Sequence, residues 1–375
     1  MRRRDWLGAS AAWLALPSGA AQAAARSAPA DTLRVALETA ETGFDPLAIG
    51  DENSNRVAAC IFESPLCYDH VARPVKLRPL TAAALPEIAD DFRSFTFRIR
   101  PGILFADDPV FKGRPRELVA QDYVYSLKRH YDPRWNSPNL YRLEAARIIG
   151  LSELRQQALK DKQPFPYERE VEGLRALDRY TFQVKLAEPS PRFHQEVMTD
   201  AANFGAVARE VVEFYGDKIM EHPVGTGPFV LAEWRRSSRI VLARNPGYRE
   251  VRYDEEAPAD DPRSQAIAAQ LKGRRMPMLD RVEIAIIEEA QPRWLSFLNG
   301  QTDLMERLPN EFAPAAAPND KLAPNLARKG TVRVDQAMAT ELADADQFTL
   351  SVRAPRSVRG YLQLPSYRLR RARKR

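Results

Sequence analysis

The stretch His222-Pro-Val-Gly-Thr-Gly-Pro-Phe229 carries the densest turn chemistry in the chain. Gly225 and Gly227 tolerate positive φ angles, whereas the two prolines fix φ at negative values. The backbone path through this loop is therefore heavily constrained. A β pattern follows directly, so the loop leads into a strand and not into a helix.

Strand and helix patterns mix along the rest of the chain. Alternating apolar residues predict strands, and apolar residues at helical spacing predict helices. Strands are expected at Thr32–Leu37, from Ser94 to a break at Pro101-Gly102, and at Tyr180–Leu186, Phe229–Glu233, Ile240–Ala243 and Arg281–Ile287. Helices are expected at Asn53–Glu63, Ala120–Tyr131 and Pro292–Asn299, and 148–172 reads as a helix followed by an exposed insertion. The mixture predicts an α/β fold with more than one sheet.

Motifs for catalysis and phosphate binding are missing from the sequence. The glycine-rich loop lacks the Gly-Lys-Ser/Thr of phosphate-binding loops, and no Gly-x-Ser-x-Gly is present. Adjacent acids such as Glu288-Glu289 are typical of solvated surface, and the four histidines lack metal-ligand spacing. We therefore expect a protein that is not an enzyme and that holds neither a metal nor another cofactor.

Four blocks in order along residues 31–310 resemble the family 5 extracellular solute-binding proteins, which include the oligopeptide-, dipeptide- and nickel-binding proteins of ABC importers. The most specific block runs from His222 to Tyr248, with Glu233-Trp234 and Arg244-Asn-Pro-Gly-Tyr248 inside it. The others are Leu33–Ala36 with Phe44-Asp45-Pro46 and Ile61-Phe62-Glu63; Phe95–Phe105 with Ala120–Arg129; and Asp280-Arg281-Val282 with Arg293–Gly300 and Asp303.

The chain departs from the family pattern at two turns. Asp107-Asp108-Pro109 and a longer insertion stand where family members usually have Asp-Gly. Val119 stands where the family often has a helix-capping threonine, so that side-chain cap is lost. Both changes affect local turns and leave the expected binding cleft untouched.

The resemblance implies a two-lobed, type II periplasmic-binding-protein fold that closes around its ligand. It places the first lobe at residues 31–66 plus 191–281, a subdomain inserted at 67–190, and the beginning of the second lobe at 282–350. Because the resemblance fades after about Met338, we expect the second lobe to be incomplete. On that expectation the 375-residue chain binds its ligand weakly or not at all.

The resemblance also indicates which residues contact a ligand. The loop after the first strand lies where ligands bind in open α/β sheets, and the matching family loop touches ligand. The site is therefore expected at Ala40, Glu41, Thr42, Phe44, Tyr141, Asn203 and Phe204. Tyr141 can equally belong to the core, and the Gly225–Pro228 turn reads as scaffold.

The N-terminus has the composition of an export signal. Three arginines at positions 2–4 precede an apolar stretch and the small-residue site Ala21-Gln22-Ala23. Arg3-Arg4-Asp5-Trp6-Leu7 also resembles a twin-arginine signal, so both export routes stay open. We expect residues 1–23 to be a signal peptide and the protein to reach the periplasm.

The net charge of +6 is unevenly distributed. Residues 351–375 contain nine Lys/Arg and no acid, so the rest of the exported chain is mildly acidic and the high pI does not indicate nucleic-acid binding. A like-charge block of this kind is predicted to be disordered. We interpret this segment as an out-of-frame translation. The alternatives are a basic tail that binds anionic lipid or nucleic acid, and the product of a degenerate gene.

Two cysteines, Cys60 and Cys67, do not amount to a disulfide framework, and we interpret them as packing residues. Together these features predict a monomeric periplasmic receptor that binds a peptide or similar small solute and delivers it to an ABC permease. The alternatives are a non-functional or interaction-only product of such a gene and, with no supporting motif, a secreted hydrolase.

Overall fold

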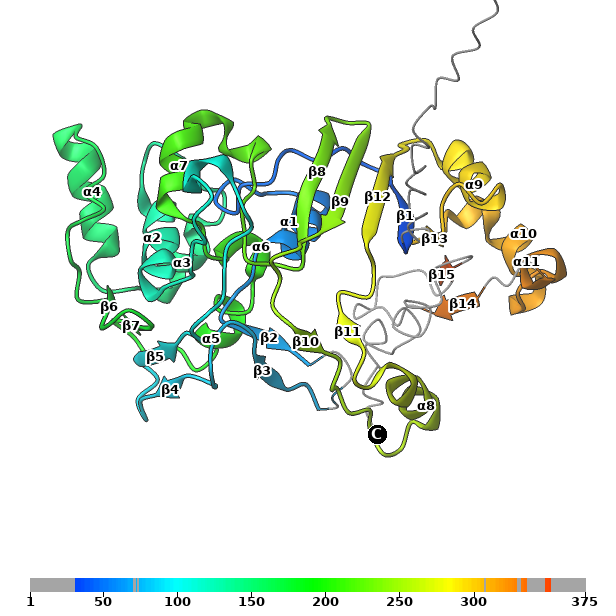
Figure 1. Cartoon of the computed structure of the whole chain (residues 1–375), viewed down its shortest axis with the longest axis horizontal. Helices are drawn as coiled ribbons and strands as arrows, with labels where there is room; N and C mark the ends of the chain where they lie inside the picture. The colour runs from blue at the N-terminus through cyan, green and yellow to red at the C-terminus, as the bar shows by residue number, and fades with distance from the viewer. Residues whose placement is uncertain are drawn as a thin grey trace, which may run out of the picture. The chain divides into compact units, whose positions relative to one another are not determined.

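The computed structural model describes residues 31–335, apart from 70, 71, 73, 307 and 329–331, together with residues 348–351. The predicted signal segment and the basic segment beyond Ser351 lie outside the described residues. The strands of these residues form two larger sheets and two small two-stranded ones (Figure 1).

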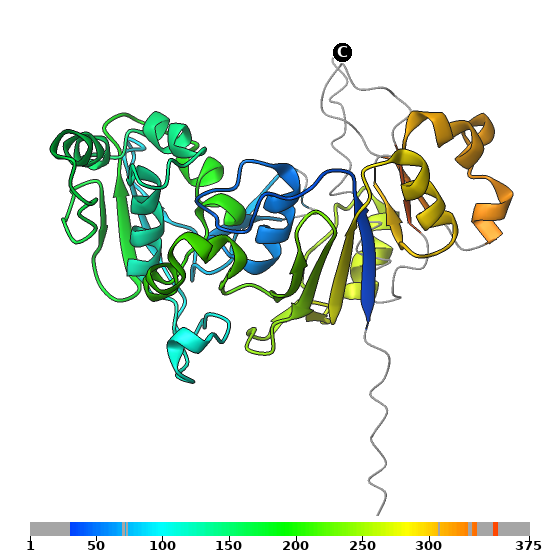
Figure 2. The same ribbon diagram turned by 90° about the horizontal axis from the view of Figure 1, so that it is seen from above.

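The larger sheet is built around β1 (Thr32–Leu37), which pairs in parallel with β12 (Arg281–Ile286) and with β13 (Leu304–Met305). Its order is β14-β15-β13-β1-β12-β9-β8, and the remaining pairs are antiparallel. Figure 2 shows β8, β9, β12 and β1 side by side. The other strands of this sheet are β8 (Phe229–Arg235), β9 (Arg239–Arg244), β14 (Val332–Asp335) and β15 (Phe348–Ser351).

The second sheet has the order β4-β5-β7-β6 and lies within residues 87–185. Phe97 and Phe182 are cross-strand partners in β5 and β7, and their stacked rings lie 4.9 Å apart between centroids. Tyr123 of α2 stacks on Phe182, so one face of this sheet is covered by α2. The strands are β4 (Glu87–Ile88), β5 (Ser94–Arg98), β6 (Leu174–Ala176) and β7 (Thr181–Lys185).

Helices and short strand pairs connect the two sheets. The small pairs are β2 (Leu66–Tyr68) with β3 (Leu77–Pro79), and β10 (Val251–Arg252) with β11 (Arg275–Met276). The α-helices are α1 (Glu52–Ile61), α2 (Ala120–Tyr131), α3 (Leu140–Ala146), α4 (Leu151–Asp161), α5 (Phe193–Glu196), α6 (Ala201–Phe204), α7 (Arg209–Tyr215), α8 (Pro262–Leu271), α9 (Ala290–Leu298), α10 (Ala313–Ala316) and α11 (Pro324–Arg328). Short 3₁₀ turns lie at Pro109–Phe111, Gly216–Glu221, Asn310–Phe312 and Pro318–Asp320.

The predicted mixture of strands and helices is confirmed, with shifts of one or two residues at most element ends. The helix predicted at Ala120–Tyr131 has those bounds and ends at Asp132 before Pro133. Val119 provides no side-chain cap, as expected, but its backbone N–H donates to the Asp122 carboxylate at 2.8 Å. Asp122 therefore stabilises the helix start from inside the first turn.

The sequence predicted that Gly225 and Gly227 serve their loop by adopting positive φ angles, and this is wrong. Neither glycine has a positive φ angle. A Cβ atom would instead lie 2.1 Å from the Ile61 carbonyl oxygen at Gly225 and 2.5 Å from it at Gly227. The Gly227 N–H donates to that same oxygen at 2.8 Å. These glycines allow the loop to approach the end of α1 closely, which is the other use of glycine.

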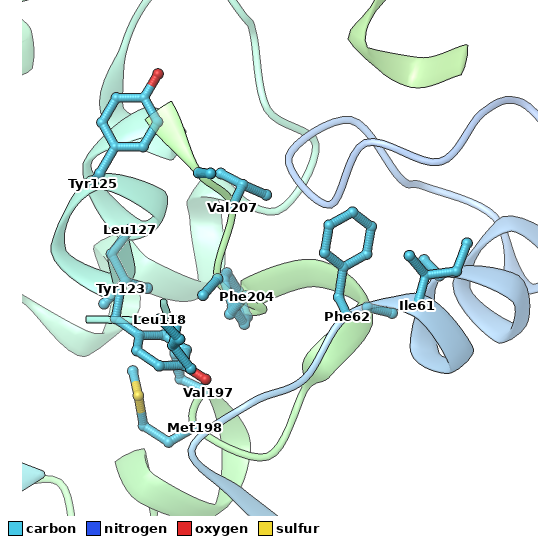
Figure 3. Packing of buried hydrophobic residues seen from close by; sticks show 14 of the residues in the cluster. Ile61, Phe62, Leu118, Tyr123, Tyr125, Leu127, Val197, Met198, Phe204 and Val207 are labelled. Carbon is cyan, nitrogen blue, oxygen red and sulfur yellow. The ribbon is translucent and has the colours of Figure 1, made fainter. Parts of the chain in front are cut away.

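One continuous cluster of buried apolar side chains runs from β1 through α1 and α2 to α8. Figure 3 shows part of it, where Ile61 and Phe62 of the α1 end lie near Phe204 and Val207. Cys60 packs against this cluster, and both cysteines are free thiols, as the packing interpretation expects.

The proposed lobe boundaries stay a prediction. The four-stranded sheet lies wholly inside the segment 67–190 that we assigned to an inserted subdomain. β12, which we assigned to the beginning of the second lobe, lies between β1 and β9 in the larger sheet.

Candidate ligand-binding site

A pocket of about 250 Å³ lies where the parallel strands of the larger sheet end. It is lined by the end of β1 and the two residues after it, by the first turns of α1, by one residue of α9 and by the residue after β13: Ala36, Leu37, Glu38, Thr39, Glu52, Asn53, Arg56, Arg293 and Glu306. Because β1, β12 and β13 run parallel, their carboxyl ends meet at one edge, which is where open α/β sheets bind ligands.

Arg56 links two acidic residues on the wall of this pocket. Its guanidinium pairs with Glu52 at 2.8 Å and also with Glu306. Burial lowers the pKa of Arg56, but the Glu306 and Glu52 carboxylates outweigh burial and the net shift is upward. This side chain therefore stays charged and holds the residue after β13 against α1.

Arg293 connects the loop after β12 to the loop after β1. It is buried, it donates to the carbonyl oxygens of Ile287 and Glu288 at 2.8 and 2.9 Å, and it pairs with Glu38 at 3.3 Å. On the other side, the Asn53 amide donates to the carbonyl and hydroxyl oxygens of Thr39, both at 2.7 Å. The residues after β1 are thus held by Arg293 of α9 and by Asn53 of α1.

Glu41 and Phe44 anchor the loop after β1 to the β8–β9 hairpin. The buried Glu41 carboxylate accepts from the Trp234 indole at 2.5 Å and from the Ser237 N–H at 2.9 Å. The Phe44 ring is buried against Trp234, with 4.8 Å between ring centroids. These two side chains face the protein interior.

Thr42 and Ala40 are the more accessible residues of that loop. Ala40 is half-buried and Thr42 is exposed. The Thr42 hydroxyl donates to Asp51 at 2.6 Å, and its N–H donates to the Ser54 hydroxyl at 2.9 Å. Asp51 also caps α1 by accepting from the Ser54 N–H at 2.7 Å, so the loop and the helix cap form one network.

The remaining predicted residues lie on α3 and α6 and are separate from the 40–44 loop. Tyr141 is 67% exposed, and Asn203 and Phe204 are buried. Asn203 accepts from the Asn139 amide at 3.0 Å and donates to Asp200. The Phe204 ring lies 4.6 Å from the Arg142 guanidinium.

None of the seven predicted residues is among those that line the strand-end pocket. Their role in binding stays a prediction. Glu38 and Thr39, immediately before the predicted loop, do line it, together with Asn53 and Arg293. The parallel-strand rule that we applied to the first strand could have pointed to the residues after β12. Arg293 stands in one of the family-like blocks, but that block does not indicate that its side chain lines a pocket.

The signature motifs meet at Glu63, away from this pocket. The buried Glu63 carboxylate accepts two hydrogen bonds from Arg249, at 2.7 and 2.9 Å. It also accepts from the Thr226 hydroxyl at 2.9 Å and from the Tyr248 hydroxyl at 3.1 Å. The Asn245 amide donates to the Gly227 carbonyl at 2.9 Å, which ties the two halves of the His222–Tyr248 block together.

Residues 76–340 match the family described as bacterial extracellular solute-binding proteins, family 5 Middle. This match covers more than half of the chain, so the chain belongs to that family, as the resemblance of its motifs predicted.

Among curated relatives, the chain is 31% identical over 207 residues to the periplasmic oligopeptide-binding protein OppA of Salmonella typhimurium, covering 55% of this chain and 34% of that protein. It is 27% identical to di/tripeptide-binding protein 2 of Pseudomonas aeruginosa, covering 63% of this chain and 41% of that protein. The chain therefore spans less than half of the length of these relatives.

Solved structures confirm the expected fold class. Haemophilus influenzae OppA in complex with the peptide RPPGFSPFR is similar with a TM-score of 0.58 at 21% identity, over 83% of this chain and 51% of that one. The murein tripeptide-binding protein MppA of Escherichia coli gives 0.58 at 22% identity, over 77% and 48%. The fold is thus that of the periplasmic peptide-binding proteins, over about half of their length.

No group of three or more His, Cys, Asp or Glu side chains among the described residues could hold a metal ion. None of the helices described here has both the length and the apolar character needed to cross a membrane.

Proposed function

We propose that the protein is a periplasmic receptor for peptides or similar small solutes, and that it serves an ABC importer by delivering its ligand to the membrane permease. The observation that carries the proposal is the polar pocket at the carboxyl ends of β1, β12 and β13 in a chain of the solute-binding family. Relatives named as oligopeptide- and di/tripeptide-binding proteins favour peptides as ligands.

The pocket suits a peptide because it offers both signs of charge beside hydrogen-bonding groups. Arg293 donates to two backbone carbonyls and pairs with Glu38, so the two side chains present a preorganised polar wall. We propose binding as a monomer and without catalysis. We also propose that the chain is divided into a first lobe at 31–66 plus 191–281, an inserted subdomain at 67–190 and a second lobe that begins at 282.

Ligand-observed NMR tests this function, because saturation transfer detects weak as well as tight binding. The full chain is mixed with a defined set of dipeptides, tripeptides and one nonapeptide. We expect saturation transfer to a subset of peptides, and its reduction by Asn53→Ala, which removes the amide that holds Thr39. Glu188→Gln, in an exposed pair with Arg147, is the matched control and should leave the transfer unchanged.

Two outcomes contradict the proposal. A folded chain that shows no transfer to any peptide supports an interaction-only role instead. Transfer that is equal in the native chain and in Asn53→Ala places the ligand away from the strand-end pocket.

A further inference from the structure

A second pocket, of about 440 Å³, lies between α2, the loop before β6, and α7. It shares no residue with the strand-end pocket. Its walls include Tyr125 and Lys128 of α2, Tyr167, Glu168 and Glu170 of the loop, and Arg209 of α7. Its volume falls in the range of small-molecule sites, roughly 300–1,000 Å³.

Tyr125 and Lys128 lie three residues apart on α2 and so share one helix face. Tyr125 is 5% exposed, and within the described part of the chain its hydroxyl makes no hydrogen bond. Figure 3 shows this hydroxyl pointing away from the other labelled side chains of the core. Burial raises the pKa of Tyr125 to about 12, so at neutral pH the group is an O–H donor that opens on the pocket.

Lys128 is a buried cation with unused donor capacity. It is 3% exposed, and its ammonium donates to the carbonyl oxygens of Tyr167 and Arg169, both at 2.8 Å. An ammonium has three N–H donors, so one remains for a further acceptor. Burial lowers its pKa, while Glu168 and Glu170 act in the opposite direction.

The loop that bonds the Lys128 ammonium also carries two glutamates that line the pocket. Glu168 and Glu170 are exposed on the loop and lie within electrostatic reach of Lys128. Glu168 pairs with Arg209, whose guanidinium also lies over the rings of Tyr125 and Tyr167 at 5.7 and 5.8 Å. Glu170 makes no ion pair with any of the residues that the structure describes. One carboxylate is therefore available beside an aromatic wall.

We propose that this pocket binds a small zwitterion, of the class of a free α-amino acid, at a site separate from the strand-end pocket. Its carboxylate accepts from the remaining Lys128 N–H and the Tyr125 hydroxyl, and its ammonium lies at Glu170. An apolar ligand leaves the buried donors of Lys128 and Tyr125 unpaired, which costs binding free energy.

Calorimetric titration of the full chain with three probes tests the charge pattern. The probes are L-phenylalanine, N-acetyl-L-phenylalanine, which lacks the ammonium, and L-phenylalaninamide, which lacks the carboxylate. We expect saturable binding of the amino acid and at least about tenfold weaker binding of each derivative, because each loses one charge-assisted contact. Binding of all three with equal affinity, or of none at millimolar concentration, overturns the proposal.

Variants locate the site. Tyr125→Phe keeps the buried ring and removes the hydroxyl, and Glu170→Gln changes an exposed side chain, so both should fold. Each should weaken L-phenylalanine binding by roughly two- to tenfold. Two controls should bind as the native chain does. They are Glu172→Gln, an exposed acid two positions along that does not line the pocket, and Asn53→Ala in the strand-end pocket. If Asn53→Ala abolishes binding and Tyr125→Phe does not, the amino acid occupies the strand-end pocket and the second site does not exist.

Discussion

The region around Glu63 and the pocket at the end of β1 both depend on charged side chains, but they use them differently. Glu63 is 3% exposed, and its carboxylate bonds Thr226 and Tyr248 of the signature block and Arg249 directly after it. In the strand-end pocket, the side chains of Glu52 and Arg56 are 54% and 40% exposed. They pair with each other within α1, and Arg56 also pairs with the distant Glu306.

This difference explains why the family is easy to identify and its ligand is not. The motif residues hold α1, the glycine-rich loop and the Asn245–Tyr248 turn together, so they specify the scaffold. Glu52 and Arg56 on the pocket wall are partly solvated and lie outside the four family-like blocks, so we expect them to tolerate substitution without loss of the fold. The comparison can be tested by substituting matched residues in the two regions.

The largest effect is expected for Gly227→Ala. The added Cβ would lie 2.5 Å from the Ile61 carbonyl oxygen and 2.8 Å from that of Cys60, both backbone atoms. The loop must move, and the hydrogen bond from Gly227 to Ile61 is lost with it. We expect a loss of about 5 kcal/mol in the free energy of unfolding, measured by urea denaturation.

Gly247→Ala is the matched control in the same signature block. Its nearest contact for a new Cβ is the Asn245 side-chain oxygen at 3.5 Å, an ordinary van der Waals distance, and its φ is not positive. A change below about 1 kcal/mol is expected there. If both alanine variants are equally stable, the close approach of loop and helix is not what holds this region.

Glu63→Gln should have the next largest effect. The amide cannot neutralise the Arg249 guanidinium, which remains largely buried beside it with one nitrogen, Nε, lacking a hydrogen bond. Removing one partner of a buried ion pair costs about 3 to 5 kcal/mol. Urea denaturation measures it against Glu188→Gln, whose exposed pair with Arg147 should be worth less than about 1 kcal/mol. Equal losses in the two variants would show that burial does not distinguish these ion pairs.

The fold was predictable from sequence to the extent that local pattern and signature motifs determine it. Phe95 and Phe97 alternate with polar residues and are buried in β5, and the apolar spacing of Ala120–Tyr131 gave the bounds of α2. The role of Gly225 and Gly227 was assigned to backbone angle, because a sequence shows which residues lack a side chain but not which backbone approaches them.

The candidate site was predicted only in its neighbourhood. The rule for parallel strands led to the loop after β1, and the pocket begins one or two residues earlier, at Glu38 and Thr39. Arg293 and Glu38 are 255 positions apart, and their contact depends on the parallel pairing of β1 with β12. Residues 40 to 44 stay a prediction as ligand contacts, and the inward direction of Glu41 and Phe44 depends on Trp234, far along the chain.

The pH dependence of stability tests whether His130, which is buried like Glu63, is shielded from water in the folded protein. Burial, helped by the neighbouring Arg129, lowers the pKa of His130 from 6.5 to about 4. Its neutral ring bonds Ser137 and the Asn203 carbonyl. The unfolded chain takes up this proton first, so stability is full above about pH 6.5 and falls as the pH drops towards 4, by at most about 3 kcal/mol.

Urea denaturation at several values between pH 4 and 7.5 measures this loss. In His130→Gln this group no longer takes up a proton on unfolding. The slope of the free energy of unfolding against pH should therefore fall by an amount that corresponds to at most one proton. Parallel curves for the two proteins would mean that water reaches the ring and that this interior is open.

The smallest effect is expected for Glu52→Gln in the strand-end pocket. Arg56 keeps its pair with Glu306, and the lost pair with Glu52 is largely solvated. Exposed i, i+4 pairs contribute about 0.3 to 0.5 kcal/mol, so the free energy of unfolding should fall by no more than that. The same substitution changes the charge of the pocket, so saturation transfer to peptides should change while stability does not. A loss of stability comparable to that of Glu63→Gln would mean that the pocket wall belongs to the scaffold, and the distinction between the two regions would fail.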